Sequence, residues 1–303
     1  MQKVCILLST YNGAEHLKEQ LDSLYAQTYS DIEIIVRDDG SIDNTIEILK
    51  SYDVKLIETK ENLGAKGSFA ELLNYAVANS ESDYFMFCDQ DDVWESDKVE
   101  KTLAKMQELE QEFSNIPLLV HTDLKVVDEH LHTIGASMWA YETIDPSKNS
   151  LNRLLIHNTI TGCTMMINRK LAQKCLPIPN GAIMHDWWIG LVASSFGKIA
   201  YIDQSTIQYR QHSKNDTGTR KYSLGYIFDR FKKLGNIDID KNIIQANFFL
   251  ESFDDELKSS DKNMLKDFAI IKDKSYLKRV YILFKHDIFK HGFFRNLGLI
   301  FKI

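Results

Sequence analysis

The sequence predicts an α/β protein: a mostly parallel sheet flanked by helices, followed by a C-terminal helical extension. Three observations support this prediction. β-rich runs alternate with helical patterns through the first part of the chain, polar clusters follow three of those runs, and strand patterns stop after about Lys221. Repeated strand–helix units produce parallel strands that helices cover on both faces.

Four short apolar runs in the first part are predicted strands, each followed by a helical pattern. The predicted strands are Val4–Leu8, Ile32–Val36, Val54–Glu58 and Tyr84–Cys88, and the predicted helices are Glu15–Ala26, Thr45–Ser51, Lys66–Ala78 and Asp97–Glu110. In a sheet of this kind, ligands bind beyond the carboxyl ends of the strands. The polar residues after each strand are therefore the first candidates for a site.

The pattern in the second part of the chain predicts the other half of a mixed sheet. Shorter β-like pieces lie at Leu118–His121, Lys125–Val127, Thr164–Ile167, Lys198–Ile202 and Ile207–Tyr209, with an apolar helix at Asp186–Phe196. We expect one domain over residues 1–220, with halves of about 1–115 and 116–220. A helical region follows over residues 221–303.

Composition excludes several classes of protein. The chain has 303 residues, of which 44% are hydrophobic, so a disordered or fibrous chain is excluded. A formal net charge of −7 argues against a general nucleic-acid-binding protein, which needs a broad basic surface. The four cysteines form no C-x-x-C pair, and no apolar run is long enough for a membrane-spanning helix. We expect reduced thiols, a cytoplasmic location and, at most, peripheral contact with a membrane.

The acidic cluster Asp89-Gln90-Asp91-Asp92 directly follows the predicted strand Tyr84–Cys88. In extended chain Asp89 and Asp91 point to one side, and their oxygens suit Mg²⁺ or Mn²⁺. An isolated cluster of this kind is more often a solvated acidic turn at a helix start. Its position at a strand end, in register with two other polar clusters, favours the metal site.

The other two polar clusters are Ser9-Thr10-Tyr11-Asn12 and Asp38-Asp39-Gly40-Ser41. Tyr11 offers a flat face on which a base can stack, and an ionised Asp39 accepts hydrogen bonds only. Both clusters also fit simple structural roles, as a helix cap and as a tight turn. The two interpretations are compatible.

These motifs together resemble the family 2 glycosyltransferases. The resemblance rests on Ile6–Gly13, on Arg37–Ser41 with Asp43-Asn44-Thr45, on Asn62-Leu63-Gly64 and on Asp89–Asp92, four motifs in order over the first hundred residues. It implies a GT-A fold, with a nucleotide-binding sheet, a donor half at about 1–115 and an acceptor half at about 116–220. It also implies that Thr10, Tyr11 and Asn12 line the nucleoside pocket, that Asp39 accepts from a pyrimidine N3–H, and that Asp91 ligates the metal with Asp89 beside it or beside the ribose.

The same resemblance places the catalytic base at Asp186. The family carries a Glu-Asp pair there, whereas this chain has His185-Asp186, so the role of His185 stays open. An acidic residue at a helix start is equally well explained as a favourable charge at the helix dipole. Trp187 is either an apolar platform for the donor sugar or part of the core.

A polar stretch after the last predicted strand supplies further candidates. Arg210 and Lys214 are candidates to bind diphosphate oxygens, and His212 to complete the metal shell, as in the Tyr-Arg-x-His stretch of many members of the family. A lone histidine is more often structural. The Q-x-x-R-W signature of processive synthases is absent from the sequence.

A further resemblance, to bacterial rhamnosyltransferases of cell-wall and O-antigen synthesis, rests on Cys88–Trp94, on His157-Asn158 with Thr161–Asn168, and on His185–Trp188. That resemblance implies dTDP-β-L-rhamnose as donor and a lipid-linked saccharide as acceptor, with a UDP-hexose or UDP-HexNAc donor as the alternative and a non-catalytic nucleotide-sugar-binding module as a weaker one. The tail, residues 275–303, has a formal charge of +5 and many aromatic residues. Such helices lie on the inner face of a membrane, pack on the domain, or form a homodimer contact.

Overall fold

The computed structural model describes residues 2–212 and 239–303. In this part of the chain nine strands form one sheet, in the order β3-β2-β1-β4-β8-β6-β9-β5, with β7 beside β6. The strands are β1 (Val4–Thr10), β2 (Ile32–Asp38), β3 (Lys55–Glu58), β4 (Tyr84–Cys88), β5 (Val93–Trp94), β6 (Leu118–Val127), β7 (Thr133–Gly135), β8 (Met165–Asn168) and β9 (Lys198–Arg210). The predicted α/β class is confirmed.

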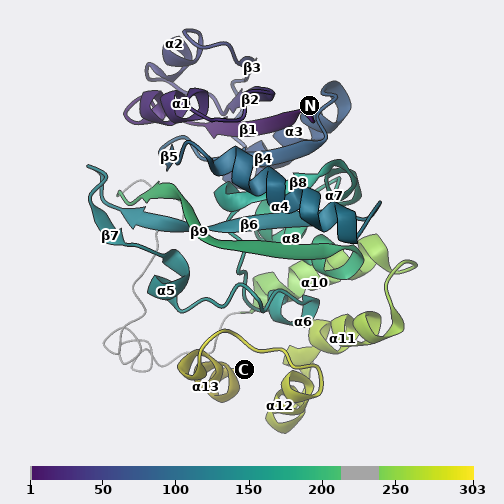
Figure 1. Ribbon diagram of the computed structural model, residues 1–303. Coiled ribbons are helices and arrows are strands. Elements are labelled where there is room, and N and C mark those ends of the chain that lie inside the picture. Colours follow the sequence, from purple (N-terminus) through teal and green to yellow (C-terminus); the bar gives the residue numbers. More distant parts are fainter. Residues whose placement is uncertain (1, 213–238) are drawn as a thin grey trace.

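Helices surround this sheet (Figure 1). They are α1 (Leu17–Tyr25), α2 (Thr45–Leu49), α3 (Gly64–Asn79), α4 (Lys98–Glu112), α5 (Met138–Glu142), α6 (Leu151–Leu154), α7 (Arg169–Lys174), α8 (His185–Phe196), α10 (Asp240–Phe253), α11 (Ser259–Ala269), α12 (Tyr276–Lys285) and α13 (Phe293–Lys302), with 3-10 turns η1 (Gly162–Thr164) and η2 (Ile271–Asp273). No helix in the described ranges is both long and apolar enough to cross a bilayer.

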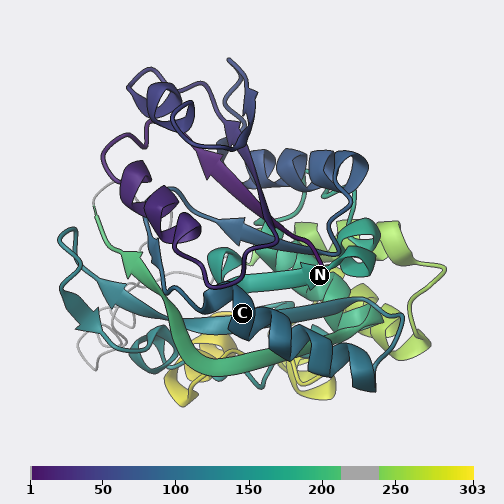
Figure 2. The ribbon, with the colours of Figure 1, turned by 45° about the horizontal axis from the view of Figure 1, so that its top comes forward.

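Strands β1 to β4 run parallel, because each is joined to the next by a chain segment that carries a helix. The next strand, β8, is antiparallel to both β4 and β6, and β6 is parallel to β9. The sheet is therefore mixed, as the shorter β-like pieces of the second half predicted. The carboxyl ends of β1, β2 and β4 meet at one edge, where the motif residues lie (Figure 2).

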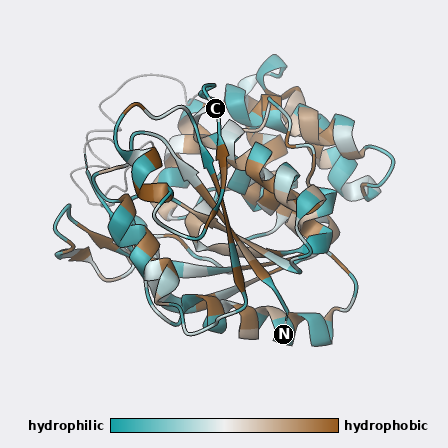
Figure 3. Ribbon diagram, turned by 90° about the horizontal axis from the view of Figure 1, so that it is seen from above, coloured by the Kyte–Doolittle hydropathy of each residue, from teal (hydrophilic) through white to brown (hydrophobic). Residues whose placement is uncertain are grey.

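Because side chains alternate along β1 and β4, these strands contribute to two hydrophobic cores, one on each face of the sheet. Cys5, Leu7 and Phe85 face the core that contains α3 and α8. Val4 and Ile6 face the core that contains α1 and α4. Successive side chains of a strand point to opposite faces, so a continuous apolar run fills both cores. Seen from above, the central strands are mostly hydrophobic, whereas the helices around them carry both hydrophobic and hydrophilic segments (Figure 3).

Two pairs of predicted pieces form single longer strands. Leu118–His121 and Lys125–Val127 both belong to β6, and Lys198–Ile202 and Ile207–Tyr209 both belong to β9. Polar residues interrupt the apolar pattern in both strands: Thr122 and Asp123 of β6 are buried, whereas Asp203 and Gln204 of β9 are exposed. Thr122 and Thr206 share a buried hydrogen bond of 2.7 Å. A bulge in the β6 ladder accommodates the remaining irregularity.

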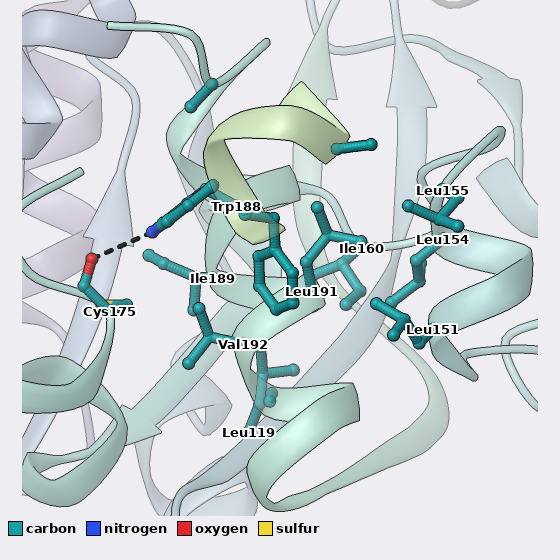
Figure 4. Packing of buried hydrophobic residues seen from close by; sticks show 14 of the residues in the cluster. Leu119, Leu151, Leu154, Leu155, Ile160, Cys175, Trp188, Ile189, Leu191 and Val192 are labelled. Carbon is teal, nitrogen blue, oxygen red and sulfur yellow. Dashed lines mark hydrogen bonds between the residues drawn. The ribbon is translucent and has the colours of Figure 1, made fainter. Parts of the chain in front are cut away.

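The C-terminal helices extend the core on the α8 face of the sheet. Phe249 of α10, Leu265 of α11, Leu283 of α12 and Leu299 of α13 belong to the same cluster as Trp188 of α8. Figure 4 shows how Trp188 lies within this packing, where its indole N–H donates to the Cys175 carbonyl at 3.0 Å. The helical extension is confirmed, but the expected boundary at 220/221 lies outside the described residues.

Candidate active site

A pocket of about 370 Å³ opens at the carboxyl ends of β1, β2 and β4. Its walls come from both halves of the chain. The lining residues are Ser9, Tyr11, Asp39, Asn62, Gly64, Ala65, Phe69, Asp89, Gln90, Asp91, Thr161, Gly162, Met184, His185, Asp186 and Tyr209. The fold thus brings all three polar clusters and the start of α8 to one cavity, as expected for a ligand site at strand ends.

Asp89 and Asp91 line this pocket, but Gln90 between them lines it as well, so the alternation expected after β4, with Gln90 on the other side, does not hold. Asp91 is joined to the polar stretch after β9, because its Oδ2 lies 2.8 Å from Nε2 of His212. The ring of His16 stacks on that of His212 at 5.4 Å. Two carboxylates and an imidazole form a donor set that suits Mg²⁺ or Mn²⁺. These residues therefore fit the metal that the resemblance implies.

A second group of potential ligands lies deeper. Ligand atoms of Asp89, Asp92 and Cys163 lie within 4.8 Å of one another. Asp92 is fully buried, and burial together with the charges of Asp91 and Asp89 holds its pKa well above the usual range. Burial also raises the pKa of the Cys163 thiol. A neutral carboxyl and a neutral thiol are poor ligands for a hard cation, so the pocket-lining Asp91, with His212 beside it, suits the cation better.

Asp92 instead connects β4 to β9, since its Oδ1 accepts from the Arg210 amide at 3.1 Å. The fully buried Lys98 lies near it, and burial lowers the pKa of that amine to about 8. Lys98 packs over the Trp94 ring at 4.6 Å. Lys98 carries no sequence signal for this buried position, because a lysine at a helix start is typical of a surface residue.

The two carboxylates in the turn after β2 have different surroundings. Asp38 organises the turn: its Oδ1 accepts from the amides of Gly40 and Ser41, at 3.1 and 2.8 Å. Gly40 has a φ of 83°, a left-handed conformation that favours glycine. Asp39 lines the pocket. The tight-turn and ligand interpretations of this motif therefore apply to different residues.

Asp39 is held in a fixed position. It is 2% exposed, forms an ion pair with the buried Arg37, and accepts from the Leu63 amide at 2.8 Å. Asn62, next to Leu63 in the third motif, also lines the pocket. A carboxylate has about four lone-pair sites, so Asp39 keeps capacity for a further donor from a ligand.

The β1 motif places only part of its residues at the pocket. Tyr11 lines it, and the Gln90 amide holds the Tyr11 backbone by accepting from N at 2.8 Å and donating to O at 3.1 Å. Thr10 is buried and donates to Asp38 at 2.9 Å. Asn12 accepts from the Ile42 amide at 2.9 Å. The structure therefore gives Thr10 and Asn12 contacts that shape the loops, and neither is among the lining residues.

At the start of α8, Asp186 lies in the pocket wall. Its Oδ2 accepts from the Gly162 amide at 3.1 Å, and burial raises its pKa to about 7. A carboxylate with a pKa near neutrality accepts and releases protons at working pH. This raised pKa goes beyond the role of a helix-dipole charge, which would lower the pKa instead.

His185 also lines the pocket, between two aromatic rings. Its ring lies 4.3 Å from that of Phe69 and 5.2 Å from that of Phe87. Burial lowers its pKa to about 3, so the imidazole is neutral near pH 7. A Cβ on Gly162 would lie 2.8 Å from Nε2 of His185, so glycine is required where η1 approaches α8.

Arg210 and Trp187, which were expected to contact the donor, form hydrogen bonds within the protein instead. The Arg210 guanidinium is 2% exposed, pairs with Glu19 and donates to the carbonyls of Asp91 and Glu129. The Trp187 indole donates to the Leu154 carbonyl and packs against the core. Neither residue is among those that line the pocket, because these contacts hold the side chains of Arg210, at the end of β9, and of Trp187, in the first turn of α8, away from it. Lys214 lies outside the described residues.

The comparison with known families decides between the folds that carry such a pocket. Residues 5–176, more than half of the chain, match the model of "Glycosyl transferase family 2". The chain belongs to glycosyl transferase family 2. The match covers β1 to α7, and so includes Asp39, Asp89 and Asp91, but it ends before Asp186.

Curated relatives agree with this family. An uncharacterized glycosyltransferase of Rickettsia prowazekii is 30% identical over 221 residues, which is 71% of this chain and 66% of the relative. The putative teichuronic acid biosynthesis glycosyltransferase TuaG of Bacillus subtilis is 29% identical over 202 residues, covering 64% of this chain and 73% of TuaG. The matched region thus spans slightly less than two thirds of the Rickettsia relative.

Solved structures confirm the GT-A type of fold. A fragment of S. aureus TarS in complex with UDP-GlcNAc has a TM-score of 0.61 at 14% identity, covering 94% of this chain and 80% of that one. The mannosyltransferase PcManGT of Pyrobaculum calidifontis, in complex with GDP-Man and Mn²⁺, has a TM-score of 0.50 at 16% identity, covering 94% and 73%. At these identities the likeness concerns the fold alone.

Several pocket residues were missed by the sequence analysis. Gln90 was assigned to the far side of its strand end, yet it ties Tyr11 to β4. Phe69 of α3, Thr161 just before η1 and Tyr209 of β9 also line the pocket. Thr161 and Tyr209 belong to stretches with a family resemblance but had no role assigned, whereas Phe69 carries no motif and reaches the pocket only through the packing of α3.

Proposed function

We propose that the protein is an inverting, metal-dependent glycosyltransferase that moves a sugar from a nucleotide sugar to a lipid-linked saccharide. The observation that carries this proposal is the position of Asp186. A carboxylate with a pKa of about 7 shares one pocket with Asp39, Asp89 and Asp91. A proton acceptor beside a nucleotide-and-metal site is the arrangement that a direct displacement at a sugar requires.

In this proposal the donor half holds the nucleotide. The Tyr11 ring stacks on the base, and Asp39 accepts from its N3–H. Asp89 and Asp91, with His212, would hold the divalent ion, which when bound offsets the negative charge of the diphosphate. Thr10 and Asn12 support these contacts through the loop hydrogen bonds described above.

The reaction is one displacement. The acceptor hydroxyl oxygen forms a bond to the anomeric carbon while the bond from that carbon to the diphosphate oxygen breaks. Asp186 takes the hydroxyl proton, and the bonding electrons leave with the nucleoside diphosphate. Because attack comes from the face opposite the leaving group, the anomeric configuration inverts, and a β-linked donor gives an α-linked product.

For the donor we propose dTDP-β-L-rhamnose, on the basis of the motif variants around Asp89–Trp94, Thr161–Asn168 and His185–Trp188. A UDP-hexose or UDP-HexNAc is the second candidate, which the TarS complex with UDP-GlcNAc favours. Asp39 accepts from N3–H of thymine and uracil alike, so this contact does not separate the two. A non-catalytic binding module would leave the raised pKa of Asp186 without a use.

A donor panel tests the proposal. UDP-, GDP- and dTDP-sugars are each incubated with a rhamnosyl- or GlcNAc-diphospholipid acceptor and Mg²⁺ or Mn²⁺, and nucleoside diphosphate release is measured. Release that requires the acceptor, with an inverted product by NMR, is expected for one nucleotide class. If a nucleotide sugar binds but no member of the panel shows acceptor-dependent release, the protein is a non-catalytic nucleotide-sugar-binding module and the transferase proposal is wrong.

A further inference from the structure

The C-terminal helix α12 is apolar on two opposite faces. At 100° per residue, Leu277, Tyr281 and Phe284 fall on one side of the helix, and Ile282 and Leu283 fall near the other. The second side is buried in the core, whereas the first is exposed. A helix that only packs on its domain has one apolar face and one polar face. The exposed apolar face of α12 therefore needs a partner.

Helix α13 repeats this arrangement. Leu299 is buried in the core, and Phe293, Phe294 and Phe301 lie on the opposite side. The five most exposed apolar residues of the two helices, Leu277, Tyr281, Phe284, Phe293 and Phe301, are between 60% and 79% exposed. Both helices lie at the end of the molecule remote from α2 and β3 (Figure 1).

Charge around these faces is strongly positive. Residues 275–303 hold six Lys and Arg against one Asp, a formal charge of +5 in a chain of formal charge −7. The acidic residue, Asp287, is engaged by Arg153 of α6 at 2.6 Å. Lys278 is exposed and forms no ion pair with a described residue, and Arg279 donates to the uncharged carbonyls of Lys272 and Lys274. Lys285 pairs with Asp267 of α11 at 2.7 Å. Lys278 and Arg279 are therefore the α12 cations that flank the exposed aromatic and aliphatic surface without an acidic partner in the described part of the chain.

We propose that the outer faces of α12 and α13, named here the C-terminal face, bind the surface of an anionic lipid bilayer. The aromatic and aliphatic side chains enter the boundary between headgroups and acyl chains, while the cations meet anionic headgroups. With no spanning helix in the described ranges, this contact is interfacial. A second copy of the chain fits less well, because a two-fold contact would bring together two segments of like charge, each with six Lys and Arg against one Asp over residues 275–303.

The test uses the full chain and vesicles, and needs neither donor nor turnover. Flotation is measured with vesicles of phosphatidylcholine alone and of phosphatidylcholine with phosphatidylglycerol. We expect binding to the anionic vesicles that weakens as salt is raised, since salt screens the headgroup charge. The double variant Leu277→Ser/Phe284→Ser should lower the partition coefficient at least about tenfold, and Lys278→Glu should lower it less.

Ile42→Ser is the matched control, because Ile42 is 92% exposed and lies near α2, at the other end of the molecule. The thermal midpoints of all variants should equal that of the parent, since the changed side chains are exposed. A parent that does not float with anionic vesicles, or a double variant that floats as well as the parent, overturns the proposal. A dimer in sedimentation that Leu277→Ser/Phe284→Ser dissociates would assign the face to a second copy instead. Failure of the transfer assay leaves this result unaffected.

Discussion

The Asp186 carboxylate accepts a hydrogen bond from the backbone amide of Gly162, 3.1 Å away. This bond joins the first turn of α8 to the 3-10 turn before β8, two segments that are 24 residues apart in the sequence. Because Gly162 has no side chain, η1 comes close to both Asp186 and His185. The carboxylate is therefore fixed in the pocket wall and shielded from water, which raises its pKa to about 7.

Replacing Asp186 with Asn tests its role as the base. The amide keeps the size of the carboxylate but cannot take a proton, so turnover should fall by roughly 10²–10⁴ while nucleotide binding is unchanged. The measurement is acceptor-dependent diphosphate release, with nucleotide affinity from calorimetry on the same sample. Asp203→Asn, at an exposed position on β9, is the control. Transfer at the parent rate by the Asp186→Asn protein would place the base elsewhere.

The pH dependence of kcat/KM should report the ionisation of Asp186. Asp186 accepts a proton only when ionised, and its pKa is about 7. We therefore expect log kcat/KM to rise with a slope of about one up to pH 7 and to level off above it. A profile that is already flat from pH 5 to pH 8 would be incompatible with a base of this pKa.

The free energy of unfolding should also depend on the ionisation of Asp186, and it should fall as pH rises. The folded-state pKa of Asp186 lies above its ordinary value of 3.8, so the folded protein binds more protons than the unfolded chain between the two values. This group's contribution to the free energy of unfolding is therefore lost as pH rises from about 4 to 7, by an amount on the order of 4 kcal/mol. Urea unfolding of parent and Asp186→Asn across this range should show a decline that the variant lacks. Parallel curves would contradict the raised pKa.

Tyr11 and Asp39 line the same pocket but should respond differently to substitution. Tyr11 is 48% exposed, so Tyr11→Ala should weaken nucleotide binding about tenfold or more through lost stacking, with little effect on stability. Asp39→Asn leaves the buried Arg37 cation without its partner, and should cost about 3–5 kcal/mol of stability as well as affinity. Calorimetric titration with the nucleotide and urea unfolding measure the two effects. Equal stability losses would show that Asp39 is not bound to Arg37 as described.

Metal dependence tests Asp91. Asp91→Asn should reduce turnover by orders of magnitude, and EDTA should do the same to the parent, because both remove charge that stabilises the leaving diphosphate. Titration with Mn²⁺ should show weaker binding to Asp91→Asn than to the parent. Asp97→Asn is the control, since Asp97 pairs with Lys101 at the surface of α4. Undiminished activity in EDTA would rule out the metal.

Local patterns were enough to predict the strand and helix order of the first half and the placement of three motifs at strand ends. The run Tyr84–Cys88 before Asp89 is continuous and apolar, and the run before Asp39 has an apolar centre at Ile34-Ile35-Val36. In a parallel sheet such runs end at one edge. The apolar pattern of Asp186–Phe196 likewise predicted that Asp186 begins a helix. These features depend on neighbours within a few residues, so the sequence carries them.

Which polar residue faces the ligand was decided by tertiary structure. Asp38 and Asp39 are adjacent in sequence, yet one organises a turn and the other lines the pocket. Arg210 was expected at the diphosphate, but Glu19, 191 residues away in the sequence, binds its guanidinium. A buried charge must be paired and a buried indole N–H must find an acceptor, and the partner is brought close only by folding. Composition and periodicity determined the fold and the edge of the sheet that carries the site, whereas long-range packing determined which side chains remain available to a ligand.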